Sequence, residues 1–153
     1  MQSEPIRTAP PPFKIIKGHT IETETAEAAI ETIHASIPDW HKNSSIVKKF
    51  LHNRETTFYW ASTDGKLIGY VCLHRTGCVP YIAVAKSNSR SGVGRALMLR
   101  AAKKARKLGN QKLELTSENS ANDFYRKIEN EIGPVKIEIA GQYSNITYSL
   151  LPH

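Results

Sequence analysis

The stretch AVAKSNSRSGVGRAL, residues 83–97, is the most specific local feature of this sequence. It continues a nearly unbroken apolar run, Val79 to Ala85, which is typical of a central strand buried on both faces. Its second half opens a long helix, predicted from about Gly92 to Leu108, because apolar residues recur there at helical spacing. Gly109 is expected to end the helix in the left-handed conformation. The stretch therefore predicts a buried strand, a glycine turn and a long helix in direct succession.

The turn before this helix has the features of an anion site. The first N–H groups of a helix lack partners within it, and the helix dipole adds partial positive charge. Gly92 and Gly94 would let a phosphate approach the backbone, and Arg90 and Arg95 would add charge-assisted contacts. Two other phosphate motifs are excluded, because Leu97 stands at the third glycine of the dinucleotide pattern and the Gly-Lys-Ser/Thr of a P-loop is absent.

The rest of the chain predicts an α+β (mixed α/β) fold in one domain. Strands are expected at 13–17, 56–62, 66–73, 79–85, 111–116, 135–140 and 143–150, from alternation and turn signals. Helices are expected at 26–37 after a Thr25 cap, at 46–51 after a Ser44 or Ser45 cap, at 92–108 and at 121–129. Hairpin turns are expected at 63–65 and 141–142. We expect a central, mostly antiparallel twisted sheet of roughly six or seven strands flanked by about four helices.

Length and composition are those of a globular protein. The 153 residues are 40% hydrophobic and 23% charged, which excludes a collagen-like or wholly disordered chain. Residues 1–12, which end in three prolines, are expected to be a mobile tail ahead of a domain at 13–153. No apolar run approaches the ~20 residues that span a bilayer, and the start lacks a signal peptide. Because two cysteines make no disulfide framework, a cytoplasmic setting is expected; no metal site is predicted.

The charge is unevenly distributed along the chain. Twenty-one basic and fourteen acidic residues give a net charge of +7, yet no acidic residue occurs between Asp64 and Glu114. That segment contains eleven lysines and arginines, so one part of the protein is suited to lie near negative charge. Nucleic acid, an acidic surface and a polyphosphate cofactor are the partners that this pattern allows. A solvated basic helix face is the plainer alternative.

Two motifs resemble those of the GNAT superfamily, the acyl-CoA N-acyltransferases. Residues 83–97 are similar to its cofactor motif, Arg/Gln-x-x-Gly-x-Gly/Ala after a hydrophobic strand, with matches at Gly92 and Gly94 and departures at Ser89 and Arg90. Residues 118–127, ENSANDFYRK, resemble a second motif, Asn-x-x-Ala-x-x-Phe-Tyr-x-Lys. There Ala121, Phe124, Tyr125 and Lys127 match, and Glu118 occupies the Asn position with Asn119 beside it. The resemblance covers roughly residues 13–150 and implies a GNAT-like fold.

The resemblance implies that acetyl-CoA is the cofactor and that the turn holds its pyrophosphate. The pantetheine arm is expected along Ile82 to Val84, where a backbone N–H would stabilise the oxyanion. The implied cofactor-binding residues are Ile82, Ala83, Val84, Ser89, Arg90, Ser91, Gly92, Val93, Gly94, Arg95, Asn119 and Tyr125.

The resemblance also implies that an amine attacks the thioester directly, without an acyl-enzyme. Tyr125 is the expected general acid, because a phenol is protonated at neutral pH; packing as a core aromatic is its alternative. The central strand lacks the acidic residue that relatives carry near the position of Tyr81. The open candidates for the general base are His74, Glu114, Glu118 and a water chain. Trp40 and Tyr81 are expected to bind the acceptor, although Trp40 could equally belong to the core.

Three functions remain open from the sequence. The first is an N-acetyltransferase that acts on a primary amine of a small molecule or peptide. The second is an RNA-directed relative that acylates aminoacyl-tRNA, as toxins of the superfamily do. Its support is the net charge of +7. It is not favoured, because no aromatic residues lie between the lysines and arginines of the long helix. The third is a non-catalytic coenzyme A-binding module. The resemblance also allows a homodimer.

Overall fold

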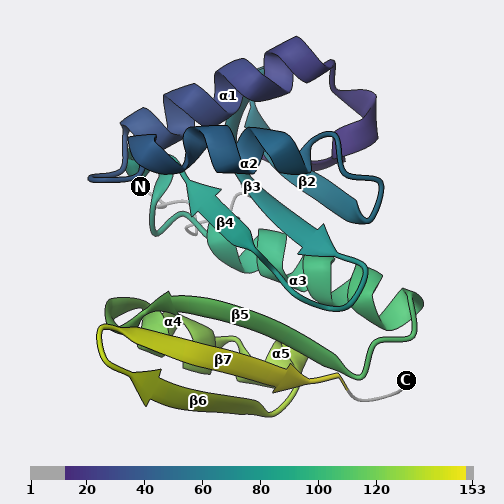
Figure 1. The fold of residues 1–153 in the computed structure, drawn as a ribbon, viewed down its shortest axis with the longest axis vertical. Coiled ribbons are helices and arrows are strands. Elements are labelled where there is room, and N and C mark those ends of the chain that lie inside the picture. Colours follow the sequence, from purple (N-terminus) through teal and green to yellow (C-terminus); the bar gives the residue numbers. More distant parts are fainter. Residues whose placement is uncertain (1–12, 151–153) are drawn as a thin grey trace, which may run out of the picture.

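The computed structural model describes residues 13–150, so the tail predicted at 1–12 lies outside the described residues. All its strand pairs are antiparallel, and they form a four-stranded sheet, β1-β2-β3-β4, and a three-stranded sheet, β5-β7-β6 (Figure 1). The strands are β1 (Lys14–Lys17), β2 (Thr56–Thr63), β3 (Lys66–His74), β4 (Tyr81–Val84), β5 (Lys112–Glu118), β6 (Val135–Ala140) and β7 (Tyr143–Ser149). This arrangement confirms the predicted mixed fold with antiparallel strands.

Helices cover both faces of the first sheet. On one face lie α1 (Thr23–Ala35) and α2 (Ser44–Phe50), and on the other lies α3 (Val93–Lys107) (Figure 1). Side chains of β2 alternate between the two cores, because successive residues of a strand point to opposite faces. Phe58 and Trp60 pack with α1 and α2, whereas Tyr59 and Ala61 pack with α3.

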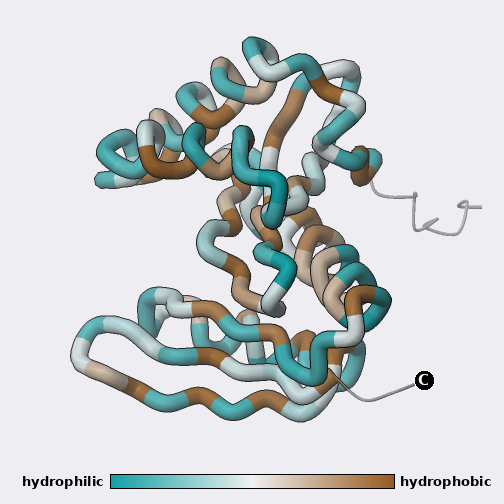
Figure 2. Tube along the Cα trace, turned by 45° about the vertical axis from the view of Figure 1, so that its right-hand side comes forward, coloured by the Kyte–Doolittle hydropathy of each residue, from teal (hydrophilic) through white to brown (hydrophobic). Residues whose placement is uncertain are grey.

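The second sheet shares its core with α3. Leu113 of β5 and Tyr148 of β7, both fully buried, belong to the same cluster as Leu97 and Met98 of α3. Two short helices, α4 (Asn122–Lys127) and α5 (Glu129–Ile132), replace the single helix predicted at 121–129 and cover the same face of this sheet. Hydrophilic and hydrophobic residues alternate along its strands, as expected of a sheet with one solvent-exposed face (Figure 2).

The two sheets diverge between β4 and β5, where one continuous sheet was predicted. Within residues 13–150 they are joined at one parallel bridge, Cys78 with Glu114, which consists of hydrogen bonds from the Val79 N–H to the Glu114 carbonyl (2.8 Å) and from the Glu114 N–H to the Gly77 carbonyl (2.8 Å). β4 is shorter than the run predicted at 79–85. Its start follows Pro80, which has no N–H to donate to a ladder.

Local turn predictions were confirmed where a left-handed residue is required. Asp64 (φ 49°) and Gly65 (φ 77°) turn the β2–β3 hairpin, and Gly109 (φ 88°) follows the end of α3. The helix-cap predictions were wrong. The cap of α1 is Glu22 rather than Thr25, and Ser44 lies inside α2, where its hydroxyl bonds to the ring of His34.

None of the helices in the described part of the chain is long and apolar enough to cross a bilayer.

Candidate active site

The turn before α3 presents backbone N–H groups at the helix N-terminus. Gly92 is the N-cap with φ 89°, and the first bond of the helix runs from the Ala96 N–H to the Gly92 carbonyl (3.0 Å). The N–H groups of Val93, Gly94 and Arg95 therefore precede the hydrogen-bonded ladder and point out of the helix end. Such a terminus attracts anions through its N–H groups and its dipole.

Serine hydroxyls hold the shape of this turn. The Ser89 hydroxyl donates to the Lys86 carbonyl (2.8 Å), and the Ser91 hydroxyl donates to the Asn88 carbonyl. These bonds fold residues 86–91, including the short 3-10 helix η3 (Lys86–Asn88), back on themselves ahead of Gly92. The two hydroxyls thus stabilise the conformation of the turn, and the groups suited to bind an anion are its backbone N–H groups.

β4 has an unpaired edge next to this turn. The Ala85 N–H donates to the Ile68 carbonyl (2.8 Å), and the ladder pairs Ala83 with Tyr70. Since hydrogen-bonded and non-hydrogen-bonded residues alternate along an antiparallel pair, Ile82 and Val84 direct their N–H and C=O groups away from β3. These groups face the side on which β4 and β5 diverge, where an extended ligand could pair with them.

A cavity of about 420 Å³ lies between β4, the turn and α4. It brings together most of the predicted cofactor residues, namely Ile82, Ala83, Val84, Ser89, Arg90, Gly92, Gly94, Arg95 and Tyr125. Gly94 lies on its wall opposite Phe124, and a Cβ at that position would come to 3.4 Å from the Phe124 ring, which is the lower limit of an ordinary van der Waals contact. Lys127, a match to the second motif, also lines this cavity and adds a cation for which the sequence had suggested no role.

Three predicted cofactor residues do not line this cavity. The Val93 side chain is buried in the core, and Ser91 bonds within the turn. Asn119 secures the β6–β7 hairpin, because its side-chain N–H donates to the Gly141 carbonyl (2.8 Å) while its oxygen accepts from the Ser144 hydroxyl (2.6 Å). Arg95 does line the cavity, but its guanidinium also pairs with Glu131 of α5 (Nε to Oε1, 2.7 Å).

A second, larger cavity of about 620 Å³ lies between the loop at 38–43, the start of β4, the end of β5 and the β6–β7 hairpin. Trp40 and Tyr81, both predicted to bind the acceptor, line it with their rings 6.2 Å apart in a T-shaped arrangement. Ile82 and Tyr125 line both cavities. The two spaces therefore meet at the Tyr125 side chain.

The Tyr125 phenol is kept protonated at this junction. Its side chain is 3% exposed, and burial raises its pKa to about 12 against an opposing hydrogen bond from the Ser117 side chain. The Tyr148 hydroxyl donates to the Tyr125 carbonyl (2.7 Å) and fixes the backbone of α4 at this residue. A fixed, protonated phenol between two cavities is suited to donate a proton to a leaving group.

The three side chains considered for the general base lie in different places. His74 is at the far end of β3, where its Nε2 lies 3.3 Å from a Glu55 carboxylate oxygen and its Nδ1 contacts the Thr76 hydroxyl (2.8 Å). Glu114 lines a neighbouring cavity of about 370 Å³. Glu118 lines the larger cavity that contains Trp40 and Tyr125. Of the three, only Glu118 lines the same cavity as Tyr125; His74 and Glu114 line neither that cavity nor the one beside the glycine turn.

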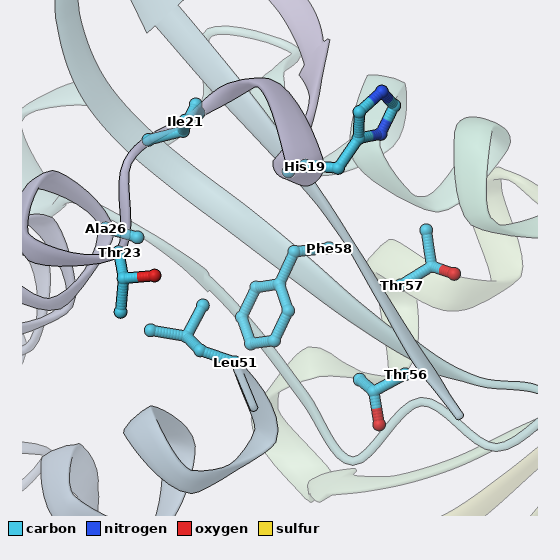
Figure 3. A pocket seen from close by; sticks show the side chains of 9 residues that line it. His19, Ile21, Thr23, Ala26, Leu51, Thr56, Thr57 and Phe58 are labelled. Carbon is cyan, nitrogen blue, oxygen red and sulfur yellow. The ribbon is translucent and has the colours of Figure 1, made fainter. Parts of the chain in front are cut away.

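A further cavity of about 320 Å³ opens between the start of α1, the residue after α2 and the start of β2 (Figure 3). Its lining includes His19, Thr23, Leu51, Thr56 and Phe58, none of which touches the other two cavities. Sequence reasoning had suggested no site there.

Known structures share this architecture. The chain is similar to PaiA N-acetyltransferase from Thermoplasma acidophilum, crystallised in complex with coenzyme A (20% identity, TM-score 0.71, 90% of this chain and 98% of that chain). It is also similar to an aminoglycoside 6'-N-acetyltransferase complexed with coenzyme A (11% identity, TM-score 0.71, 92% and 98%). A third similar structure is the ribosomal-protein-S18-alanine N-acetyltransferase from Escherichia coli (14% identity, TM-score 0.73, 92% and 96%). At these identities the likeness concerns the fold.

The curated proteins contain no match to the sequence. The family model described as acetyltransferase (GNAT) domain matches residues 21–129, which include β4, the glycine turn, α3 and Tyr125. Because this match extends over most of the 153 residues, the chain belongs to the GNAT acetyltransferase family.

Proposed function

We propose that this protein transfers an acetyl group from acetyl-CoA to a primary amine by direct attack in a ternary complex. The observation that carries the proposal is the position of Tyr125, which lines both the cavity beside the glycine turn and the cavity beside Trp40. Two substrates that occupy these spaces would meet at a proton donor. The N–H groups at the start of α3 suit the pyrophosphate, and the unpaired edge of β4 suits the pantetheine amides.

Each step of the transfer has a candidate group on this chain. Acetyl-CoA supplies the acetyl group as a thioester. The amine nitrogen forms the new amide bond as the carbon–sulfur bond breaks, and an N–H of Ile82 or Val84 stabilises the charge that develops on the carbonyl oxygen. The sulfur receives its proton from the Tyr125 phenol. The proton lost by the amine passes to Glu118, directly or through water.

The charges around the larger cavity favour a cationic small-molecule or peptide amine over RNA. Asp39, from the loop between α1 and α2, and Glu118, at the end of β5, both line it, and within residues 13–150 neither carboxylate forms an ion pair. Lys42 is the single cation among the lining residues. The segment between Asp64 and Glu114, which has no acidic residues and could attract phosphate, contains β4 and the glycine turn. Its positive charge therefore suits the proposed coenzyme cavity. Carboxylates at the mouth of the acceptor cavity would repel a nucleic-acid backbone.

The direct test is a thiol-release assay with acetyl-CoA over a panel of acceptors. The panel contains 1,4-diaminobutane, spermidine, a peptide with a free N-terminus, a lysine peptide and aminoacyl-tRNA. We expect release with at least one of the small amines or peptides. Release with charged tRNA alone would support the RNA-directed alternative. Coenzyme A binding in calorimetry without release under any condition would support a non-catalytic module.

Replacing Glu118 by Gln should lower kcat/KM for the amine by roughly 10²-fold at pH 7, because the amine would lose its proton acceptor. The loss should shrink as the pH rises, since more of the acceptor is then already neutral. The matched control is Glu114→Gln, which removes a carboxylate from the same face of β5 but outside the acceptor cavity. Equal losses in the two variants would contradict the assignment to Glu118.

Replacing Cys78 by Ser should leave the turnover within about 2-fold of wild type. A nucleophilic cysteine needs a lowered pKa, whereas partial desolvation and the nearby Glu114 carboxylate raise the pKa of the Cys78 thiol, although the residue itself is exposed. Burial likewise raises the pKa of Cys72. Mass spectrometry after a pulse of acetyl-CoA should show no acetylated protein. A stoichiometric acetyl adduct on either thiol would contradict the direct-attack mechanism.

A further inference from the structure

His34 is a buried titratable group that the transfer chemistry does not use. It lies in the last turn of α1 and is 1% exposed. Its Nε2 is 2.7 Å from the Tyr70 hydroxyl of β3, and its Nδ1 is 3.0 Å from the Ser44 hydroxyl at the start of α2. One imidazole thus joins two helices to a strand of the first sheet.

The His34 ring also contacts a wall residue of the acceptor cavity without lining the cavity itself. The rings of His34 and Trp40 are 5.2 Å apart at an interplanar angle of 84°, and Trp40 in turn makes its T-shaped contact with Tyr81. Trp40 and Tyr81 line the cavity, whereas His34 does not. Tyr70, which bonds to His34, pairs across the sheet with Ala83 of the coenzyme cavity. The contacts of His34 therefore reach the walls of both cavities.

We propose that His34 is a positioning residue that holds the Trp40–Tyr81 wall in the geometry needed for the acceptor amine. The proposal rests on the proposed function, because it assigns the wall to the acceptor. Trp40 lies in the loop between α1 and α2, and no strand pairing fixes this loop. The edge-to-face contact with His34 and the bond from His34 to Ser44 hold the loop at both ends.

The hydrogen bonds of His34 are compatible with a neutral ring, which its burial favours. Tyr70 is deeply buried and its pKa is raised by burial, so its hydroxyl is protonated and can donate to Nε2 while Nδ1–H donates to the Ser44 oxygen. A protonated ring would donate at both nitrogens, so the Tyr70 and Ser44 hydroxyls would both have to turn and accept. The charged groups nearest to His34 are Glu31 of α1 and Lys48 of α2, which pair with each other.

Acid should therefore disturb the wall. Burial lowers the pKa of His34 from the ordinary 6.5, so below pH 6.5 the unfolded chain binds more protons than the folded protein. This contribution to stability is fully present above pH 6.5 and declines as the pH falls toward the folded pKa. At the lower end of this range His34 becomes charged in a buried site, and the Tyr70 hydroxyl can then only accept from Nε2.

The kinetic test compares two substitutions of His34, with acetyl-CoA and 1,4-diaminobutane as substrates. His34→Leu should raise the KM for the diamine about 10-fold, with kcat and the Kd for coenzyme A within about 2-fold of wild type. His34→Gln should recover most of the affinity, because an amide can accept from Tyr70 yet cannot be protonated. The diamine KM of the wild type, divided by that of His34→Gln at the same pH, should rise below pH 6.5. Ionisation of the diamine affects both proteins equally and so cancels in this ratio.

A second test needs no activity and so separates this inference from the proposed function. The two tryptophans are Trp40 and Trp60, and Trp60→Phe leaves Trp40 as the sole emitter. This change breaks no hydrogen bond of the described structure, because the buried Nε1 of Trp60 has no partner there; since Trp60 packs against Tyr70 (ring centroids 5.5 Å apart), the melting temperature and diamine KM of Trp60→Phe are measured first. A protonated imidazole quenches indole emission, so the fluorescence of Trp40 should fall on acidification. His34→Gln should abolish this transition, whereas His41→Gln, at the exposed neighbour of Trp40, should leave it intact.

Tyr70→Phe provides a milder variant should His34→Leu fail to fold. It should raise the diamine KM several-fold, while Tyr59→Phe, which removes a hydroxyl from the opposite core, should not. The inference is overturned if His34→Gln keeps the acid transition of Trp40. It is also overturned if the His34 and Tyr70 variants lose stability with an unchanged diamine KM, since His34 would then serve the core alone.

Discussion

Replacing Tyr125 by Phe should lower the turnover number about 100-fold, because the departing sulfur would lose its proton donor. The Kd for coenzyme A should stay within about 2-fold of wild type, since the phenylalanine ring fills the same space between the two cavities. The measurement is steady-state thiol release together with calorimetric binding of coenzyme A. The phenol is suited to this role because it is 3% exposed and protonated throughout the physiological range.

The pH dependence adds a check on the same residue. Burial raises the pKa of Tyr125 to about 12, so the acid form should persist and kcat should show no alkaline fall between pH 8 and 10. Tyr59→Phe is the matched control, since Tyr59 is also 3% exposed but packs under α3, away from both cavities. Wild-type turnover in Tyr125→Phe would leave Tyr125 as a packing residue and remove it from the mechanism.

Replacing Gly92 by Val should weaken coenzyme A binding by roughly 10²-fold. Gly92 has φ 89°, a conformation in which a β-branched residue is strained by about 1–2 kcal/mol. The turn would relax away from this conformation, and the N–H groups at the start of α3 would lose their common orientation toward the pyrophosphate. Calorimetric titration with coenzyme A measures the loss directly, without dependence on the acceptor.

Gly109→Val is a closely matched control for this change. Gly109 has φ 88°, and a Cβ at either glycine would meet no atom within 4 Å. Both substitutions should therefore lower the melting temperature by similar amounts, because the backbone strain is the same. Only the Gly92 variant should lose coenzyme A affinity, because Gly109 lies at the opposite end of α3. Equal affinities in the two variants would mean that the turn does not hold the cofactor.

Much of the fold could be predicted because its signals are local. The turn residues Asp64 and Gly109 adopt the left-handed conformation that their sequence context predicts, and α3 runs close to the range expected from its apolar stripe. The helix-cap predictions were wrong for a physical reason. Ser44 was expected to cap α2. A serine hydroxyl can bond either to its own helix or to another segment, and the tertiary structure determines which; here Ser44 bonds to His34.

The family, the glycine turn and the candidate proton donor could be inferred from sequence motifs, because each motif lies within a few neighbouring residues. The turn, for example, needs only a strand end, Gly92 and the start of a helix. Tertiary structure decided the divergence of β4 and β5, the engagement of Asn119 with Ser144 and the burial of His34 against Tyr70. It also decided that Glu118, rather than His74 or Glu114, lines the cavity that contains Trp40 and Tyr125. These outcomes depend on contacts between residues far apart in the chain, and local spacing carries no information about which distant partner a side chain will meet.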